Sequence, residues 1–400
     1  MANKPKIRFK GFDDAWEQRK LDDVVEFLDT MRKPLEGAKR ISGSYPYYGA
    51  SGIVDYVDGY LFDEELILLS EDGANITDRN YPVCFLASGK YWVNNHAHVL
   101  RTKQGNENNF ICNSLEQKDY TQYNTGMAMP KLNKETCKKI PVSCPEFKEQ
   151  KKIGDYFRSL DHLITLHQRN CDQMKELKKY MLTKMFPQNG AKVPEIRFDG
   201  FIDDWEQRKL LSCIQSITDF RGRTPKKLGM DWSESGYLAL SALNVKDGYI
   251  DFSQDVHYGN QELYDKWMSG KELHRGQVLF TTEAPMGNVA QVPDNKGYIL
   301  SQRTIAFDVE EKILSENFLA TLLRTPNVFN DLTALSSGGT AKGVSQKSLS
   351  GLDVVIPKNI DEQNKLADYF INLDNLITLH QHKCNELREI KKYMLKNMFI

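Results

Sequence analysis

Two blocks of this sequence occur twice, and the duplication constrains the fold more than any other feature. Residues 7–20 return at 196–209, where 11 of 14 aligned positions are identical. Residues 155–186 return at 368–399, where 20 of 32 positions are identical. The first offset is 189 and the second is 213, so the second insert is longer by 213 − 189 = 24 residues. Constant blocks around two dissimilar inserts predict a pseudo-two-fold scaffold that displays two different surfaces.

The composition is that of an ordinary soluble chain of two to three domains. Charged residues make up 27% of its 400 residues, hydrophobic residues make up 40%, and the net charge is −1. No apolar run approaches the roughly 18–20 residues that cross a bilayer, and the polar start does not resemble a signal peptide. The seven scattered cysteines contain no Cys-x-x-Cys pair. We therefore expect a reduced, cytoplasmic protein without a zinc site or a membrane partner.

The repeated block at 155–186 carries apolar residues at alternating steps of four and three, the pattern of a coiled-coil seam. Its polar members, one histidine and one lysine in each copy, occupy the same places in both. We predict two helices at 151–187 and 364–400, each a rod of roughly 50 Å, that pack antiparallel within the chain. A coiled coil between two chains is the alternative. The predicted seam consists of Phe157, Leu160, Ile164, His167, Cys171, Met174, Phe370, Leu373, Ile377, His380, Cys384 and Leu387.

The two inserts contain short β-like runs separated by Gly, Asn and Asp. They predict a first domain at 1–150, and a linker with a second domain at 188–363. The expected fold class is α+β: two mostly β domains with short helices, joined by two long antiparallel coiled-coil helices in a pseudo-two-fold repeat. The runs are 45–52, 65–70, 83–87, 91–100, 236–243, 276–282 and 298–308, with a short helix at 317–330.

Catalytic motifs are missing from the sequence. It contains no Walker-type phosphate loop, no Asn/Asp-Pro-Pro-aromatic tetrapeptide of amino-methyltransferases and no His-Glu-x-x-His. Glu146 and the run Glu149–Lys151 weakly resemble a nuclease carboxylate–lysine cluster, but a solvated charged turn is the preferred interpretation. We therefore predict no catalytic residue and no cofactor bound by this chain.

Two pairs of histidines are candidates for a functional role. His96 and His98 would share one face of a strand, as half of a metal site would require, but a third ligand is missing. A structural or ligand-facing role is therefore favoured, and no metal site is predicted. For His167 and His380, packing in the seam with hydrogen bonds is preferred over a pH switch.

Basic residues gather once in each insert. Four lysines at 131–139 face one glutamate, and two arginines with two lysines at 221–227 face Asp219, so each cluster carries a local charge of +3. Such loops suit phosphate contacts and, through arginine, bidentate contact with guanine. A solvated surface patch is the alternative for each cluster.

Both inserts also end in the same way. The loops at 125–131 and 338–346 precede strand-like runs that end in proline, and Glu-Gln follows at 149–150 and 362–363 before the long helix. This shared exit indicates that the inserts are diverged copies of one fold.

The ordered set of motifs resembles the specificity subunit of type I restriction–modification systems. The resemblance rests on the paired Trp-Glu-Gln-Arg-Lys entries, the shared exits, the paired Leu-Ile-Thr-Leu-His-Gln helices at 163–168 and 376–381, and Gly-Gln-Val-Leu-Phe at 276–280. It implies two target recognition domains that each read one half of a split double-stranded DNA sequence, and helices that fix the distance between the halves. It also implies two modification subunits that carry S-adenosylmethionine and methylate adenine, and motor-nuclease subunits that carry ATP and Mg²⁺.

Base contacts do not carry over from the family, so the candidates come from side-chain chemistry. In the first domain they are Tyr47, Ser51, Asn75, Arg79, Asn94, Asn95, His96 and Lys131. In the second domain they are Arg221, Arg223, Lys226, Asn244, Thr281, Glu283, Gln302, Arg303, Lys342 and Lys347. Two alternatives compete with this interpretation: a stand-alone methyltransferase or nuclease, and a coiled-coil adaptor that does not contact DNA.

Overall fold

The computed structural model describes residues 4–188, 190–337 and 342–400. The chain forms two compact units, which we call unit 1 (Met1–Arg169 with Gln381–Ile400) and unit 2 (Asn170–His380). Each unit combines one mostly β domain with one segment of each long helix, α5 (Phe147–Lys184) and α10 (Ile360–Met398). The α+β class is as predicted. The unit boundary falls inside the helices, however, and both helices begin four residues before the predicted starts.

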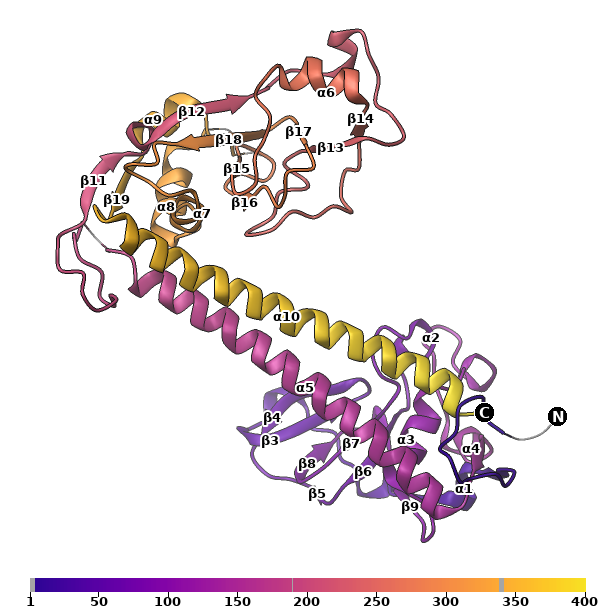
Figure 1. Cartoon of the computed structure of the whole chain (residues 1–400). Helices are drawn as coiled ribbons and strands as arrows, with labels where there is room; N and C mark the ends of the chain where they lie inside the picture. The colour runs from indigo at the N-terminus through magenta and orange to yellow at the C-terminus, as the bar shows by residue number, and fades with distance from the viewer. Residues whose placement is uncertain (1–3, 189, 338–341) are drawn as a thin grey trace. The chain divides into compact units, whose positions relative to one another are not determined.

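The two long helices run side by side and antiparallel in each unit (Figure 1). In unit 1, Lys391 Nζ lies 2.6 Å from Asp161 Oδ1. In unit 2, Lys178 Nζ lies 2.6 Å from Asp374 Oδ1. These two pairs are related by the offset of 213. They explain why a lysine stands at this place of the apolar seam in both copies: each lysine pairs with an aspartate of the other helix. The pairing lies within one chain, as predicted.

Two of the predicted seam residues, Cys171 and Cys384, contact the backbone of the other helix. Cys384 Sγ approaches Ile164 O at 3.8 Å in unit 1, and Cys171 Sγ approaches Ile377 O at 3.8 Å in unit 2. The apolar burial is strongest where a domain packs on the helices. The fully buried members are Phe157, Leu160, Cys171, Phe370, Leu373 and Cys384, and the half-buried members are Ile164, His167, Met174, Ile377, His380 and Leu387.

The domain of unit 1 (domain 1) contains two four-stranded sheets and a short strand pair. The central sheet is antiparallel, in the order β2 (Val25–Phe27), β9 (Ala97–Thr102), β6 (Leu66–Ser70) and β7 (Cys84–Ala87). The outer sheet has the order β4 (Gly52–Val57), β3 (Ser42–Gly49), β8 (Lys90–Val93) and β5 (Phe62–Asp63), with β3 and β8 parallel. Strand β1 (Glu17–Lys20) pairs with β10 (Pro141–Cys144). The short helices are α1 (Leu21–Val24), α2 (Asn75–Asp78), α3 (Asn108–Glu116) and α4 (Lys134–Cys137).

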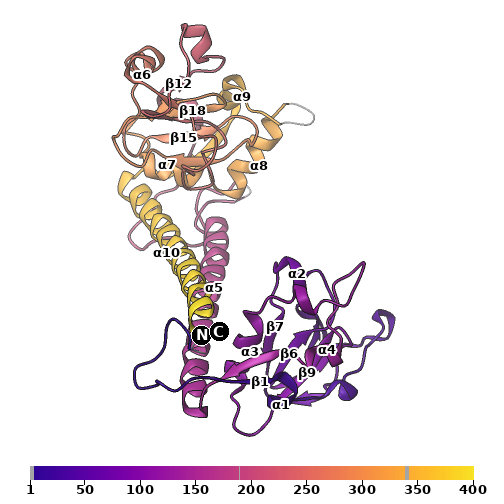
Figure 2. The same ribbon diagram turned by 90° about the vertical axis from the view of Figure 1, so that its right-hand side faces the viewer.

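The domain of unit 2 (domain 2) repeats this topology. Its central sheet has the order β12 (Ile214–Asp219), β18 (Thr304–Val309), β15 (Val278–Thr281) and β16 (Val289–Gln291), and Figure 2 shows β12, β18 and β15 side by side. Its outer sheet has the order β14 (Tyr258–Gly259), β13 (Tyr237–Leu240) and β17 (Ile299–Leu300), with β13 and β17 parallel. Strand β11 (Glu206–Lys209) pairs with β19 (Asp353–Ile356). The helices are α6 (Gln261–Met268), α7 (Glu316–Leu322), α8 (Pro326–Leu335) and α9 (Gln346–Gly351).

The central strands are buried on both faces, which explains their continuous apolar runs. In β6, Ile67 and Leu69 join the core that includes α3 and α5, whereas Leu66 and Leu68 join the core under the outer sheet. This division follows the two-residue period of a strand. In domain 2, Leu279 of β15 likewise faces the outer-sheet core while its neighbours face the core beside the helices.

The predicted helix at 317–330 is two helices, α7 and α8. Pro326 has no backbone N–H and its ring restricts the preceding Thr325, so one helix ends and another begins here. Thr325 has φ −70° and ψ 145°, an extended conformation, and Pro326 is the first residue of α8. The predicted strand at 298–308 is likewise split into β17 and β18 by a turn.

The repeated blocks form the same helix clamp in both units. In unit 1, Arg8 makes two hydrogen bonds to the Glu149 carboxylate, at 2.6 and 2.8 Å. In unit 2, Arg197 makes the same two bonds to Glu362, at 2.7 and 2.9 Å. The repeated entry motif thus binds the first turn of the long helix that leaves the same domain.

Aromatic side chains complete each clamp. In unit 1, Phe399 packs against Trp16, Phe110 and Phe157, with ring centroids 5.3–6.4 Å apart. In unit 2, the equivalent ring of Phe186 packs against Trp205, Phe318 and Phe370, at 5.9–6.0 Å. The close sequence repetition therefore coincides with the residues that join the domains to the helices.

The preferred interpretation of Glu149 and Gln150 as part of a solvated turn was wrong. Glu149 is 0% exposed and forms an ion pair with Arg8, and Gln150 is 1% exposed. Gln150 Oε1 accepts a hydrogen bond from Glu107 N, the N-cap of α3, at 3.1 Å. Gln363 does the same for Ser315 N, the N-cap of α7, at 3.0 Å. The Glu-Gln pair is a structural joint, and its carboxylate is occupied by arginine.

Candidate DNA interface

Four chain segments of domain 1 meet at the ends of the central and outer strands. Asn94 N donates to Tyr48 O at 3.1 Å, Glu71 N donates to His96 O at 2.9 Å, and Leu132 N donates to Glu71 O at 2.7 Å. These bonds join the turn after β3, the loop after β6, the β8–β9 turn and the loop before α4. We call this group of loops, residues 49–52, 70–79, 94–96 and 124–131, loop cluster 1.

Domain 2 contains the equivalent group of loops, made by the same pattern of backbone bonds. Ser301 N donates to Leu240 O at 2.9 Å, Thr282 N donates to Arg303 O at 2.8 Å, and Val344 N donates to Thr282 O at 2.9 Å. We call residues 241–244, 281–288, 301–303, 337 and 342–344 loop cluster 2. Residues 338–341 of the predicted glycine-rich loop lie outside the described residues.

The equivalent positions carry different side chains. In loop cluster 1, His96 Nδ1 lies 2.8 Å from Asp72 Oδ1. In loop cluster 2, Arg303 Nε lies 3.0 Å from Glu283 Oε1. Because His96 O and Arg303 O accept equivalent backbone bonds, these two side-chain contacts occupy corresponding places. One framework thus presents different chemistry in the two domains.

Five residues that were predicted to contact DNA have buried side chains, so the structure does not present them as contacts. They use their polar atoms to fix the loops from inside: the Tyr47 hydroxyl accepts from Leu35 N at 2.9 Å, and Asn75 Nδ2 donates to Ser70 Oγ at 2.9 Å. Amide and hydroxyl groups are chosen as readily for such internal bonds as for a ligand. The five are Tyr47, Asn75, Asn94, Asn244 and Thr281.

Three further candidates support their own domain with at least one polar group. Arg79, in a left-handed conformation with φ 56°, donates to Glu116 O and lies 3.3 Å from its carboxylate. Arg223 donates to Trp267 O, and Gln302 Nε2 donates to Arg223 O at 3.1 Å. This bond joins Arg223 to Gln302, which belongs to loop cluster 2.

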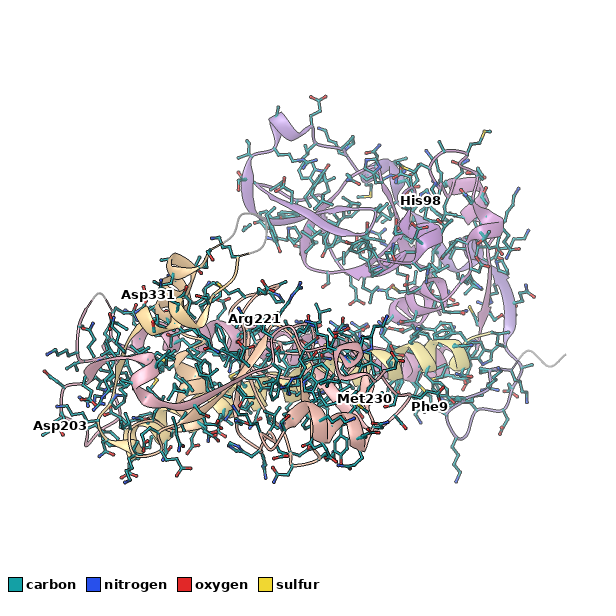
Figure 3. All side chains as sticks on the ribbon, turned by 90° about the horizontal axis from the view of Figure 1, so that it is seen from above. Phe9, His98, Asp203, Arg221, Met230 and Asp331 are labelled. Carbon is teal, nitrogen blue, oxygen red and sulfur yellow. The ribbon has the colours of Figure 1, made fainter. Side chains whose placement is uncertain are left out.

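The other candidates have exposed or half-exposed side chains. Ser51, Asn95, His96 and Lys131 belong to loop cluster 1, where Lys131 Nζ is 3.5 Å from Glu71 Oε1. Glu283, Arg303 and Lys342 belong to loop cluster 2. The basic segment at 221–227 follows β12, with Arg221 3.6 Å from Asp219 and Lys226 exposed; Figure 3 labels Arg221. Lys347 is exposed on α9, so the structure brings many of the candidates together but not all of them.

The two histidines of the predicted strand face different surroundings, so the suggested pair on one face was wrong. Strand β9 begins at Ala97, which leaves His96 in the turn. His98 is buried inside domain 1 (Figure 3), with Nδ1 2.8 Å from Asp29 and Nε2 2.8 Å from Leu132 O. Both ring nitrogens face acceptors, an arrangement that a protonated ring satisfies.

A buried charge network supports loop cluster 1 from below. Burial opposes the ionisation of Asp29, but its contacts with His98 and Arg32 outweigh that effect and lower the pKa of the Asp29 carboxyl. Arg32 also pairs with Glu71 at 2.6 Å. Sequence reasoning missed Asp29 and Asp72, since neither belongs to a motif and their partners are distant in the sequence. Across the described residues, no group of three His, Cys, Asp or Glu side chains is placed to hold a metal ion.

Loop cluster 2 borders a cavity of about 400 Å³. Two tryptophans, Trp232 and Trp267, line it together with polar groups. Three of its lining residues have left-handed backbones, which non-glycine residues rarely adopt: Asp255 at φ 43°, Ala284 at φ 48° and Arg303 at φ 64°. Such conformations collect at functional sites, where the surrounding structure imposes them.

Comparison with known proteins fits this duplicated architecture. A family model described as the type I restriction modification DNA specificity domain matches residues 13–176 and again residues 202–389. The chain belongs to this family. Each match covers one recognition domain and part of the long helix that follows it, so the duplicated sequence consists of two specificity domains.

Relatives and solved structures agree along nearly the whole chain. A putative type I restriction enzyme specificity subunit of Haemophilus influenzae is 25% identical over 366 residues, 90% of this chain and 89% of the relative. The S subunit of a type I restriction-modification system from M. genitalium shares the fold, with a TM-score of 0.70, 12% identity and 99% of each chain covered. A chain from a structure on assembly and conformational transition of the type I R-M system has a TM-score of 0.50 and 15% identity, with 98% of this chain and 99% of that chain covered. None of the described helices is both long and apolar enough to cross a membrane.

Proposed function

We propose that this chain is the DNA specificity subunit of a type I restriction–modification complex, and that each domain reads one half of a split double-stranded target. The observation that supports this most directly is the equivalence of the two loop clusters. The same backbone bonds position His96 with Asp72 in one domain and Arg303 with Glu283 in the other. Two readers built alike but with different side chains suit a bipartite sequence with unlike halves.

Two modification subunits are the proposed partners, one for each unit. On the long helices of each unit, four exposed apolar side chains lie one position before seam residues. The set is Leu163, Leu166, Ile390 and Tyr393 in unit 1, and Leu376, Leu379, Leu177 and Tyr180 in unit 2. The two sets are related residue by residue by the offset of 213. Equivalent apolar patches fit two copies of one partner, because exposed apolar clusters commonly mark protein interfaces.

Catalysis is assigned to those partners. We propose that modification subunits hold S-adenosylmethionine and methylate adenine, and that motor-nuclease subunits hold ATP and Mg²⁺ and cleave DNA. The specificity chain then contributes recognition and assembly, and works in the cytoplasm beside the DNA. Support for this division comes from the family membership and from a sequence without the catalytic motifs sought above.

The helices are the proposed ruler between the half-sites. The pairs Asp161–Lys391 and Lys178–Asp374 fix the antiparallel register within each unit. Residues 165–171 and 378–384 are equivalent heptads between these pairs, so removing both preserves the seam pattern and both ion pairs. Seven residues shorten a helix by about 10 Å, or about three base pairs of B-DNA.

The test is a paired deletion of these two heptads. The deletion chain and the parent chain would each be expressed with the partner subunits, and the methylated adenines mapped by sequencing. We expect the same two half-sites with a spacer shorter by about three base pairs, or methylation lost where the new rotation of the duplex does not fit. An unchanged spacer would contradict the ruler, and methylation that follows one continuous short sequence would contradict bipartite reading.

A further inference from the structure

From the geometry of loop cluster 2 we infer that Arg303 reads a guanine base in the half-site bound by domain 2, and that Glu283 orients it. This inference rests on the proposed function and names the residue and the base involved. Its starting point is the position of Arg303 in the three-residue turn between β17 and β18. That turn is joined to the end of β15 by the bond from Thr282 N to Arg303 O at 2.8 Å.

The side chain of Arg303 is exposed and lies beside one carboxylate. Its Nε lies 3.0 Å from Glu283 Oε1, and no other described residue forms a hydrogen bond or an ion pair with its guanidinium. The two terminal nitrogens are therefore available as a parallel pair of donors. Guanine presents N7 and O6 in the major groove as two acceptors at the spacing of this fork. The carboxylate lies beside Nε and leaves this pair free to bind the base.

The surroundings favour a base edge over a phosphate as the ligand. A phosphate contact needs only a positive charge and tolerates a flexible side chain. Arg303 instead has a left-handed backbone, φ 64°, as has Ala284, φ 48°, and both residues line the same cavity. Gln302 and Arg223 line the same cavity and are joined by the bond from Gln302 Nε2 to Arg223 O, 3.1 Å. This polar lining suits recognition of one particular edge.

Domain 1 supplies an internal comparison. At the place of Arg303 it has His96, and at the place of Glu283 it has Asp72, 2.8 Å from His96 Nδ1. With Nδ1 occupied by the carboxylate, only Nε2 of His96 is left to face a base. One nitrogen makes one hydrogen bond, so domain 1 discriminates less at this position than the fork of Arg303 does.

The experiment compares three variants of the full chain assembled with its partner subunits. Arg303→Ala removes the fork, and Arg303→Lys keeps the charge without the fork. Arg275→Ala is the matched control: Arg275 is exposed in the same domain and lies before β15, whereas Glu283 lies after it. Each complex would methylate a library of duplexes with randomised half-sites, and the preference at every base would be measured.

We expect both Arg303 variants to lose the preference for guanine at one position of one half-site, by roughly 5- to 150-fold. The other half-site should be unchanged, and Arg275→Ala should preserve every preference. If Arg303→Ala weakens all sequences uniformly, Arg303 contacts phosphate and the inference is overturned. If Arg303→Lys keeps the guanine preference, the two-donor fork is not what reads the base, and the inference is overturned as well. A parent complex that selects no sequence would overturn the proposed function and this inference together.

Discussion

Units 1 and 2 have the same helix clamp, yet their domains carry opposite charges at one equivalent position. Nine residues after the equivalent N-caps of α3 and α7, unit 1 has Glu116 and unit 2 has Arg324. Arg324 pairs with Asp374 at 2.8 Å, whereas Glu116 Oε2 accepts backbone bonds from domain 1 at 2.8 and 2.9 Å. The helix residues are constrained by each other and by the clamp, so they repeat closely. The domain residues beside the helices are constrained only by contacts within their own unit, and they have diverged.

The clamp should give the largest effect, and it should be stronger in unit 2. Replacing Glu362 by Ala leaves Arg197 without its buried partner and should lower the free energy of unfolding by about 3–5 kcal/mol. Glu149→Ala should cost about 1 kcal/mol less. The reason is that Trp205 Nε1 also donates to Glu362 at 3.1 Å, whereas Trp16 Nε1 has no hydrogen-bond partner among the described residues.

Equilibrium urea unfolding of the full chain, with hydrogen exchange to separate the units, would measure both variants. Glu17→Ala is the control, because Glu17 pairs with Arg19 on an exposed strand and should contribute little. Equal losses for Glu362→Ala and Glu149→Ala would show that the tryptophan bond adds nothing to the clamp.

The helix ion pairs should give the next largest difference. Asp374→Ala removes the partner of Lys178 and of Arg324, whose side chains are only 13% and 10% exposed. We expect a loss of about 2–3 kcal/mol, reduced because Arg324 keeps Asp247. Asp161→Ala is the matched variant: this carboxylate is 45% exposed and, among the described residues, forms an ion pair with Lys391 alone, so the loss should stay within about 1 kcal/mol. Similar losses from urea unfolding of the two variants would show that the diverged Arg324 does not strengthen unit 2.

The sequence was sufficient to predict the helices, their antiparallel pairing and the duplication of the domains. These features follow from local periodicity and from repetition, which are visible along the chain. The state of Glu149 was not predictable in this way, because its partner Arg8 is 141 positions away. The same limit explains Asn75 and Asn244: an amide shows that a hydrogen bond is needed, but not whether the bond is made inside the domain. The equivalence of His96 and Arg303 required the backbone bonds that only the structure contains.

The smallest expected effect concerns pH and unit 1 alone. Burial raises the pKa of the Glu116 carboxyl above its ordinary value of 4.5, against the opposing influence of Arg79. Because the folded pKa exceeds the unfolded one, the folded state binds this proton more tightly, so ionisation reduces the free energy of unfolding. That reduction begins as the pH rises from about 4.5 and is complete above the folded pKa. Arg324 is charged throughout this range, so unit 2 has no counterpart.

Glu116→Gln removes the ionisation and keeps an oxygen to accept the bonds from Val83 N and Cys84 N, 2.9 and 2.8 Å long in the parent chain. The variant should therefore gain stability relative to the parent as the pH rises above 4.5, by on the order of 1 kcal/mol or less. Glu135→Gln is a control in which the effect of pH has the opposite sign. The bond with Lys138 lowers the pKa of Glu135, so the ionised carboxylate stabilises the folded chain, and this stabilisation is lost as the pH falls. Urea unfolding between pH 2 and pH 8, a window that extends to both sides of the ordinary glutamate pKa, would measure both slopes. If the free energy of unfolding of Glu116→Gln depends on pH as that of the parent chain does, burial in domain 1 does not oppose the charge of Glu116. A glutamate in unit 1, at the position where unit 2 has Arg324, would then carry no electrostatic cost.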